Sequence, residues 1–175
     1  PAIMFDIDDT IFSTFPLAES QNFGYDAKKF KKAEEENNMP LIKPVAMFIF
    51  ACKAMGILPI FVTGRRPANK NQTLEQLIVS GLVPGETFWG GATYNGGNLM
   101  RGVEKPSNVV PADVYAEKGT IESFHGIFFN GSIPQLPASE YKEKVRCWIE
   151  KNGLANNPIK FIMSVGDQWS DSNGG

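Results

Sequence analysis

Cysteine and histidine are scarce in this chain. Its 175 residues include two cysteines and one histidine, His125. Two cysteines are too few for the disulfide framework of a small secreted domain, and Cys52 and Cys147 each fall in an apolar helical pattern. We therefore expect two buried thiols. His125 lies in a glycine- and proline-rich region, where we expect a surface or packing role rather than a catalytic one.

An excess of charge and a long apolar run are also missing. The 17 basic and 19 acidic residues leave a net charge of −2, which gives no electrostatic reason to expect a nucleic-acid polymer or a membrane as partner. The most apolar stretch, residues 45–62, is interrupted by Lys53, Gly56 and Pro59, so we expect a buried helix, a turn and a strand. We also find no signal-peptide pattern. Compartment and oligomeric state stay open.

Strands and helices alternate along the chain, which predicts a single α/β domain over residues 1–175 with a mostly parallel sheet. Helices are expected at 44–55, 72–80 and 139–152, and strands at 3–5, 57–62 and 159–165. Two further segments do not fit this alternation. The polar and mixed residues 12–42 are expected to form a small cap or lid, and residues 84–137 an irregular insertion with short β-like runs at 86–89 and 127–129.

Three of the apolar runs lead directly into reactive side chains. FDIDDT places Asp6, Asp8 and Asp9 after the first strand, VTGR places Thr63 after the second, and VGDQWSD follows the last. Each motif alone is equally typical of a turn or a helix cap. Their conjunction is informative, because the carboxyl ends of parallel strands share one edge of an open sheet, where ligands bind.

These groups match the requirements of phosphoryl transfer. Asp6 can act as the nucleophile and form an aspartyl-phosphate, and Asp8 can act as general acid and later activate water. Mg²⁺ prefers oxygen ligands, which Asp6, the Asp8 main-chain carbonyl and Asp167 would supply. Asp171 would hold a metal-bound water or serve as a further ligand.

The phosphate itself needs hydrogen-bond donors and a positive charge. The Thr63 hydroxyl and the amides of Gly64 and Arg65 can cradle an anion. A cation must offset the gathered carboxylates, and the candidates on the predicted helix 139–152 are Lys142 and Lys144.

Together these motifs resemble those of the haloacid dehalogenase (HAD) superfamily. More narrowly, FDIDDT, TGR, YKEKVR and SVGDQWSD are similar to the subfamily IIIB acid phosphatases and the plant vegetative storage proteins. The resemblance implies a Rossmann-like core and Mg²⁺-dependent hydrolysis of phosphate monoesters. It also implies one role for each matched residue: Asp6 nucleophile, Asp8 acid and base, Thr63 phosphate ligand, Lys142 charge clamp, Asp167 metal ligand.

Several functions remain open at this point. A phosphotransferase would use the same intermediate, with an alcohol in place of water, and a storage or binding protein could use the same scaffold without turnover. A dehalogenase is disfavoured because it has no leaving oxygen for Asp8 to protonate. A receiver domain is disfavoured because its phosphorylated aspartate follows a central strand, whereas the strand ending at Thr63 carries none. The organic part of the phosphate monoester is not readable from the sequence.

Overall fold

The structure is a computed structural model. It describes residues 1–36, 38–82, 94–95, 98–99, 115–116, 121–124, 127–131, 136–153, 158–168 and 171. The elements, in chain order, are β1 (Ala2–Phe5), α1 (Phe15–Ser20), α2 (Ala27–Glu35), α3 (Lys43–Ala54), β2 (Leu58–Thr63), the short 3-10 helix η1 (Pro67–Asn69), α4 (Lys70–Val79), β3 (Tyr94–Asn95), β4 (Asn98–Leu99), β5 (Tyr115–Ala116), β6 (Ile121–Phe124), β7 (Ile127–Asn130), α5 (Ala138–Asn152) and β8 (Phe161–Val165).

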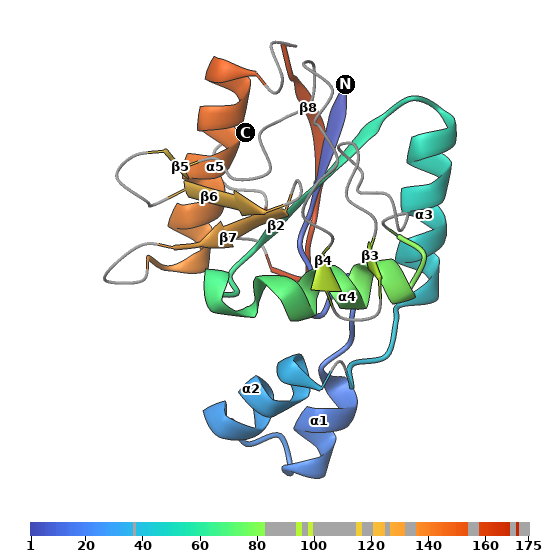
Figure 1. Cartoon of the computed structure of the whole chain (residues 1–175), viewed down its shortest axis with the longest axis vertical. Helices are drawn as coiled ribbons and strands as arrows, with labels where there is room; N and C mark the ends of the chain where they lie inside the picture. Colours follow the sequence, from blue (N-terminus) through green and yellow to red (C-terminus); the bar gives the residue numbers. More distant parts are fainter. Residues whose placement is uncertain are drawn as a thin grey trace.

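The main sheet is mostly parallel, as the alternation of strands and helices predicts (Figure 1). Its six strands lie in the order β5-β6-β7-β2-β1-β8. The pairs β7–β2, β2–β1 and β1–β8 are parallel, and β6 and β5 extend the β7 edge as antiparallel strands. This arrangement confirms the α/β class with a Rossmann-like core.

Side chains of the strands alternate between two cores, one on each face of the sheet. On β1, Ile3 and Phe5 point to the core covered by α3 and α4, whereas Ala2 and Met4 point to the core covered by α5. Strands β2 and β7 divide their side chains in the same way. Helices therefore cover both faces, and the ends of the strands are left as the accessible edges.

The helices begin and end close to the predicted positions. Pro44 lies in the first turn of α3, where its missing N–H costs no hydrogen bond, and Gly56 follows the helix with φ +70°. Gly81 follows α4 with φ +72°, and both glycines supply the left-handed conformation that ends a helix. On α5 the sequence pattern predicts an apolar stripe of Tyr141, Val145, Trp148 and Ile149; Tyr141, Val145 and Ile149 are fully buried, and Trp148 is half-buried against the same core.

The β-like run predicted at 127–129 is confirmed, since it lies in β7. Its place in the main sheet was not predicted: β7 pairs with β2 and is one of the parallel strands. The prediction of two buried thiols is wrong for one of them: Cys52 is buried but Cys147 is exposed. Cys147 falls on the outer face of α5, between the buried positions of the stripe. The run 86–89 and His125 lie outside the described residues.

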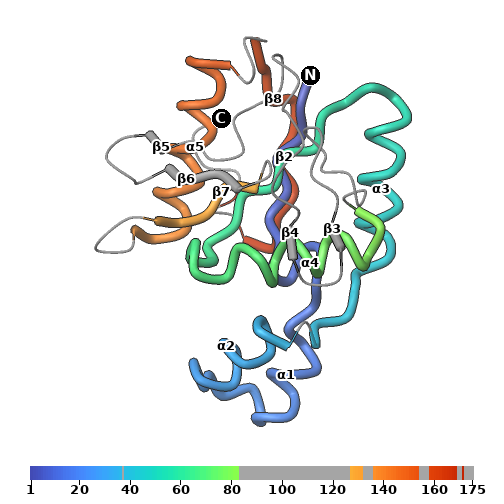
Figure 2. The backbone as a smooth tube through the Cα atoms, in the orientation of Figure 1, coloured from blue at the N-terminus to red at the C-terminus, as the bar shows by residue number. Residues whose placement is uncertain are grey.

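Between β1 and α3 the chain leaves the core and returns to it, as Figure 2 shows. The outgoing and returning connections run side by side, because Ser13 N–H donates to Pro40 O at 2.9 Å and Ile42 N–H donates to Ile11 O at 2.8 Å. Helices α1 and α2 form the excursion, and Asp26 caps α2 by accepting from Lys28 N–H at 2.9 Å. Among the described residues, no helix combines the length and apolar character needed to cross a membrane.

Candidate active site

The topology of the sheet sets the position of the site. β2 and β7 lie on one side of β1 and β8 lies on the other, so the strand order reverses at β1. Ligand crevices of open α/β sheets form at such a reversal, outside the carboxyl ends of the strands. Asp6 directly follows β1 there, and its N–H donates to Val165 O of β8 at 2.9 Å. Asp167 comes two residues after the end of β8.

One lysine joins two carboxylates at this edge. Lys142 Nζ of α5 lies 2.9 Å from Asp6 Oδ1 and also donates to Asp171 Oδ1. All three side chains are buried. Lys144, the other candidate cation, instead pairs with Glu140 of the same helix at 3.8 Å, and both of these side chains are well exposed. The geometry therefore favours Lys142, as the family resemblance does.

Burial and charge act in opposite directions on this cluster. Burial raises the pKa of Asp6 to about 7, although the nearby Lys142 ammonium pulls it down. Burial alone would lower the pKa of Lys142, but the carboxylates of Asp6 and Asp171 outweigh it and raise that pKa above its ordinary value. Lys142 thus stays charged, and the cluster as a whole holds more negative than positive charge.

Three carboxylates in the cluster fit a hard divalent cation. One oxygen each from Asp6, Asp167 and Asp171 lies within 4.8 Å of the others. Gly166 makes this approach possible, because a Cβ atom there would lie 2.0 Å from Asp171 Oδ2. Gln168 N–H donates to the same oxygen at 3.1 Å and fixes the loop. An all-oxygen donor set with surplus negative charge matches the preference of Mg²⁺.

Thr63 closes β2 beside this edge and is fully buried. Its hydroxyl oxygen accepts from Arg65 N–H at 3.1 Å, which leaves the hydroxyl hydrogen available for donation. The roles of Thr63, Gly64 and Arg65 as phosphate ligands stay predictions.

Asp8 is not part of the acidic cluster, since its carboxylate turns toward Arg65. Arg65 Nε lies 3.1 Å from both carboxylate oxygens and NH2 lies 2.6 Å from Oδ1. Asp8 remains partly exposed, with 32% of its side chain accessible, whereas the Arg65 side chain is 1% accessible. The acid and base role of Asp8, and its main-chain carbonyl as a metal ligand, stay predictions.

Asp9, the third carboxylate of FDIDDT, has a structural part. It adopts φ +54°, in the left-handed region, and its carboxylate accepts from Thr14 N–H at 2.7 Å and Thr14 Oγ1–H at 2.6 Å. This is the turn-forming behaviour typical of aspartate. It tightens the turn that follows β1 and leaves Asp6 and Asp8 as the candidate reactive carboxylates.

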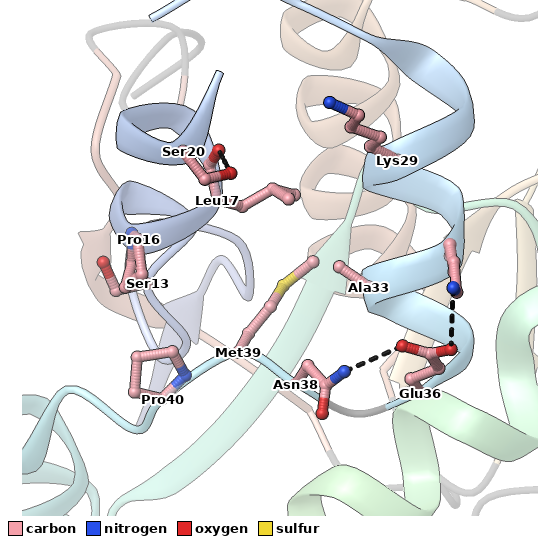
Figure 3. Close-up of a pocket in the computed structure, with 11 residues that line it drawn as sticks. Ser13, Pro16, Leu17, Ser20, Lys29, Ala33, Glu36, Asn38, Met39 and Pro40 are labelled. Carbon is pink, nitrogen blue, oxygen red and sulfur yellow. Dashed lines mark hydrogen bonds and ion pairs between the residues drawn. The ribbon is translucent and has the colours of Figure 1, made fainter. Parts of the chain in front are cut away.

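A cavity of about 440 Å³ lies between α1 and α2 (Figure 3). Met39 reaches into it from below, toward Leu17 and Ala33, and Lys29 and Lys32 line its α2 side. The sulfur of Met39 also lies 3.7 Å from Arg65 NH2. The α1–α2 excursion therefore contacts the same guanidinium that holds Asp8, and nothing in the sequence pattern signals this contact.

Comparison with known proteins agrees with this geometry. The model of the family described as HAD superfamily, subfamily IIIB (acid phosphatase), matches residues 1–108, which is more than half of the chain. The chain therefore belongs to the HAD superfamily and, within it, to subfamily IIIB, the acid phosphatases. None of the curated proteins matches it. The matched segment contains Asp6, Asp8 and Thr63, and the fold brings Lys142 and Asp171, from beyond that segment, to the side chain of Asp6.

Proposed function

We propose that this protein is a Mg²⁺-dependent phosphatase that hydrolyses small phosphate monoesters through an aspartyl-phosphate on Asp6. The observation that carries the proposal is the buried cluster in which Lys142 Nζ lies 2.9 Å from Asp6 Oδ1 and also bonds Asp171. A carboxylate nucleophile needs such a neighbour, because a phosphate monoester brings further negative charge toward it. Membership of the acid phosphatase subfamily supports the same reaction class.

In the first step a carboxylate oxygen of Asp6 attacks phosphorus. The bond between phosphorus and the ester oxygen breaks, and Asp8 gives its proton to the departing oxygen. In the second step the Asp8 carboxylate takes a proton from water as the water oxygen attacks phosphorus. The bond from Asp6 to phosphorus then breaks, and its electron pair returns to the Asp6 carboxylate as inorganic phosphate leaves.

The remaining side chains orient the phosphate and balance its charge. Lys142 offsets the charge that Asp6 and the phosphate oxygens share, and the Thr63 hydroxyl with the Gly64 amide would donate hydrogen bonds to those oxygens. The Arg65 amide would join them if the phosphate replaces its present acceptor, Thr63 Oγ1. Asp6, Asp167 and Asp171, with the main-chain carbonyl of Asp8, would hold Mg²⁺. When bound, the ion supplies positive charge that neutralises the phosphate. The partner is a small molecule, and the even charge balance gives no reason to expect a nucleic-acid polymer.

Turnover of para-nitrophenyl phosphate tests the proposal. We expect phosphate release that stops with EDTA and returns with added Mg²⁺. An Asp6→Asn variant, purified in parallel, should release none and so excludes a contaminating enzyme. Failure of the wild-type protein to hydrolyse this ester at any Mg²⁺ concentration would contradict the proposal and favour a binding or storage role.

A further inference from the structure

We propose that Arg65 is the positioning residue for Asp8: its guanidinium fixes the direction of the carboxylate that moves protons in both steps. This inference rests on the proposed function and adds a residue role to it. Arg65 follows Thr63 closely enough to be expected as a phosphate ligand, but the position of its side chain points to a different task.

The contact between Arg65 and Asp8 is a fork, that is, a bidentate ion pair in which two guanidinium nitrogens contact one carboxylate. Nε of Arg65 lies 3.1 Å from each Asp8 oxygen, and NH2 lies 2.6 Å from Oδ1. Charge-assisted bonds of this kind are stronger than neutral ones, and the planar fork also fixes the angle of the carboxylate. Asp8 sits in a turn with a partly exposed side chain, so without this fork it would have several orientations available.

Arg65 is itself held from three sides. NH1 lies 3.1 Å from Thr73 Oγ1 and 3.1 Å from Gln76 Oε1, both on α4, and NH2 lies 3.7 Å from the sulfur of Met39. Every nitrogen of the guanidinium therefore has an acceptor within the protein, so no N–H is left for a phosphate oxygen. A rigid anchor of this kind is what a positioned acid or base requires.

The fork also suits the chemistry of Asp8. When Asp8 gives its proton to the leaving oxygen, the carboxylate that forms stands beside a positive charge that is already in place. No reorganisation is needed at that moment. In the second step the same fork aims the carboxylate at the attacking water, where a small misplacement is costly.

Two phosphate esters of similar size but different leaving groups distinguish a loss of Asp8 positioning from a general structural defect. Para-nitrophenyl phosphate releases a stable phenolate and needs little help from an acid. Para-nitrobenzyl phosphate releases an alkoxide and depends on proton donation. We would measure kcat and KM for both by phosphate release, for the wild type, Arg65→Met, Arg65→Lys, Asp8→Asn and the double variant Arg65→Met with Asp8→Asn.

We expect Arg65→Met to lose on the order of 10²-fold more kcat/KM on the benzyl ester than on the phenyl ester, since a general acid contributes about 10²–10⁴-fold. The loss should lie in kcat, and Asp8→Asn should show the same pattern. The double variant should show the same difference in kcat/KM between the two esters as Asp8→Asn alone, because Arg65 acts through Asp8. Arg65→Lys, which keeps the charge but not the fork, should lie between wild type and Arg65→Met, and it preserves the test if Arg65→Met does not fold.

Leu77→Ala is the matched control, because Leu77 lies fully buried on α4 beside the anchors of Arg65 but belongs to the apolar core. Leu77→Ala should lower the stability of the protein and leave the ratio of its kcat/KM values on the two esters unchanged. Equal losses on both esters in Arg65→Met and Arg65→Lys, with Asp8→Asn still selective, would overturn the role of Arg65 alone. Absence of wild-type turnover of either ester would overturn the proposed function and this inference together.

Discussion

Lys142 and Asp6 form a buried ion pair, with 2.9 Å between Nζ and Oδ1, at the point where the strand order of the mostly parallel sheet reverses. Lys142 also bonds Asp171, so one ammonium serves two carboxylates that come from different ends of the chain. Buried charges persist only where partners compensate them. The stability of the fold and the chemistry of the site are therefore coupled at this lysine.

Replacing Lys142 by methionine should destabilise the metal-free protein by about 3–5 kcal/mol at neutral pH, because it leaves buried carboxylates without their cation. Turnover should be lost as well. Urea unfolding in EDTA measures the first effect. Lys144→Met, which removes an exposed partner of Glu140 on the same helix, should cost less than about 1 kcal/mol and retain activity. Equal stability of the two variants would contradict the assignment of Lys142.

Asp6 should make the stability of the metal-free protein depend on pH. Its pKa rises from the ordinary 3.8 to about 7 in the folded state, so the folded protein binds this proton more tightly than the unfolded chain. The contribution of Asp6 to the free energy of unfolding is complete below about pH 4 and is lost as the pH rises to about 7. In this range the free energy of unfolding falls by up to about 1.4 kcal/mol per pH unit. Asp6→Asn should remove this slope. Urea midpoints between pH 5 and 8 in EDTA that change equally in both proteins would show that Asp6 is not the cause.

Mg²⁺ should stabilise the folded protein in the absence of any substrate. Binding at 100 times the dissociation constant adds about 2.7 kcal/mol to the free energy of unfolding. Asp167→Asn should raise the Mg²⁺ concentration needed for this stabilisation at least about tenfold, since it removes one carboxylate charge from the cluster. Asp26→Asn is the control, because Asp26 caps α2 and asparagine caps a helix equally well. An unchanged Mg²⁺ response in Asp167→Asn would remove Asp167 from the metal site.

Gly166→Ala should abolish turnover while the fold persists. The new Cβ would lie 2.0 Å from Asp171 Oδ2, so Asp171 must move and its bond to Lys142 must break. Gly56→Ala is a contrasting variant, with no atom within 4 Å of the new Cβ but a backbone φ of +70°. It should cost about 1 kcal/mol of stability and leave turnover intact. An active Gly166→Ala protein would contradict the role of Asp171.

Much of the fold and part of the site follow from local patterns. Short apolar runs predict the central strands, and helical periodicity predicts the three long helices. The ends of the predicted strands indicate where Asp6 and Asp167 lie. The choice between Lys142 and Lys144 does not follow from periodicity, because both lie on α5 and only packing against the sheet buries one of them.

Long-range pairings could not be predicted. The fork between Arg65 and Asp8 joins residues 57 positions apart, and its geometry depends on side chains of α4 that carry no motif. Membership of a motif also does not determine a residue's role. Asp9 belongs to the same motif as Asp6 and Asp8, yet its left-handed backbone directs its carboxylate to Thr14. The run 127–129 was predicted to be β-like, but its parallel pairing with β2 could not be predicted, because the run lies among glycine- and proline-rich residues far from β2 in the sequence.

The most direct test of the central claim is to trap the covalent intermediate. The protein would be mixed with para-nitrophenyl phosphate and Mg²⁺, quenched in acid and treated with borohydride, which reduces an aspartyl-phosphate to homoserine. The account predicts homoserine at position 6, seen by mass spectrometry of the peptide that contains this residue, with none in samples that lack substrate. Steady turnover with Asp6 always recovered unmodified, or homoserine at another aspartate, would contradict it.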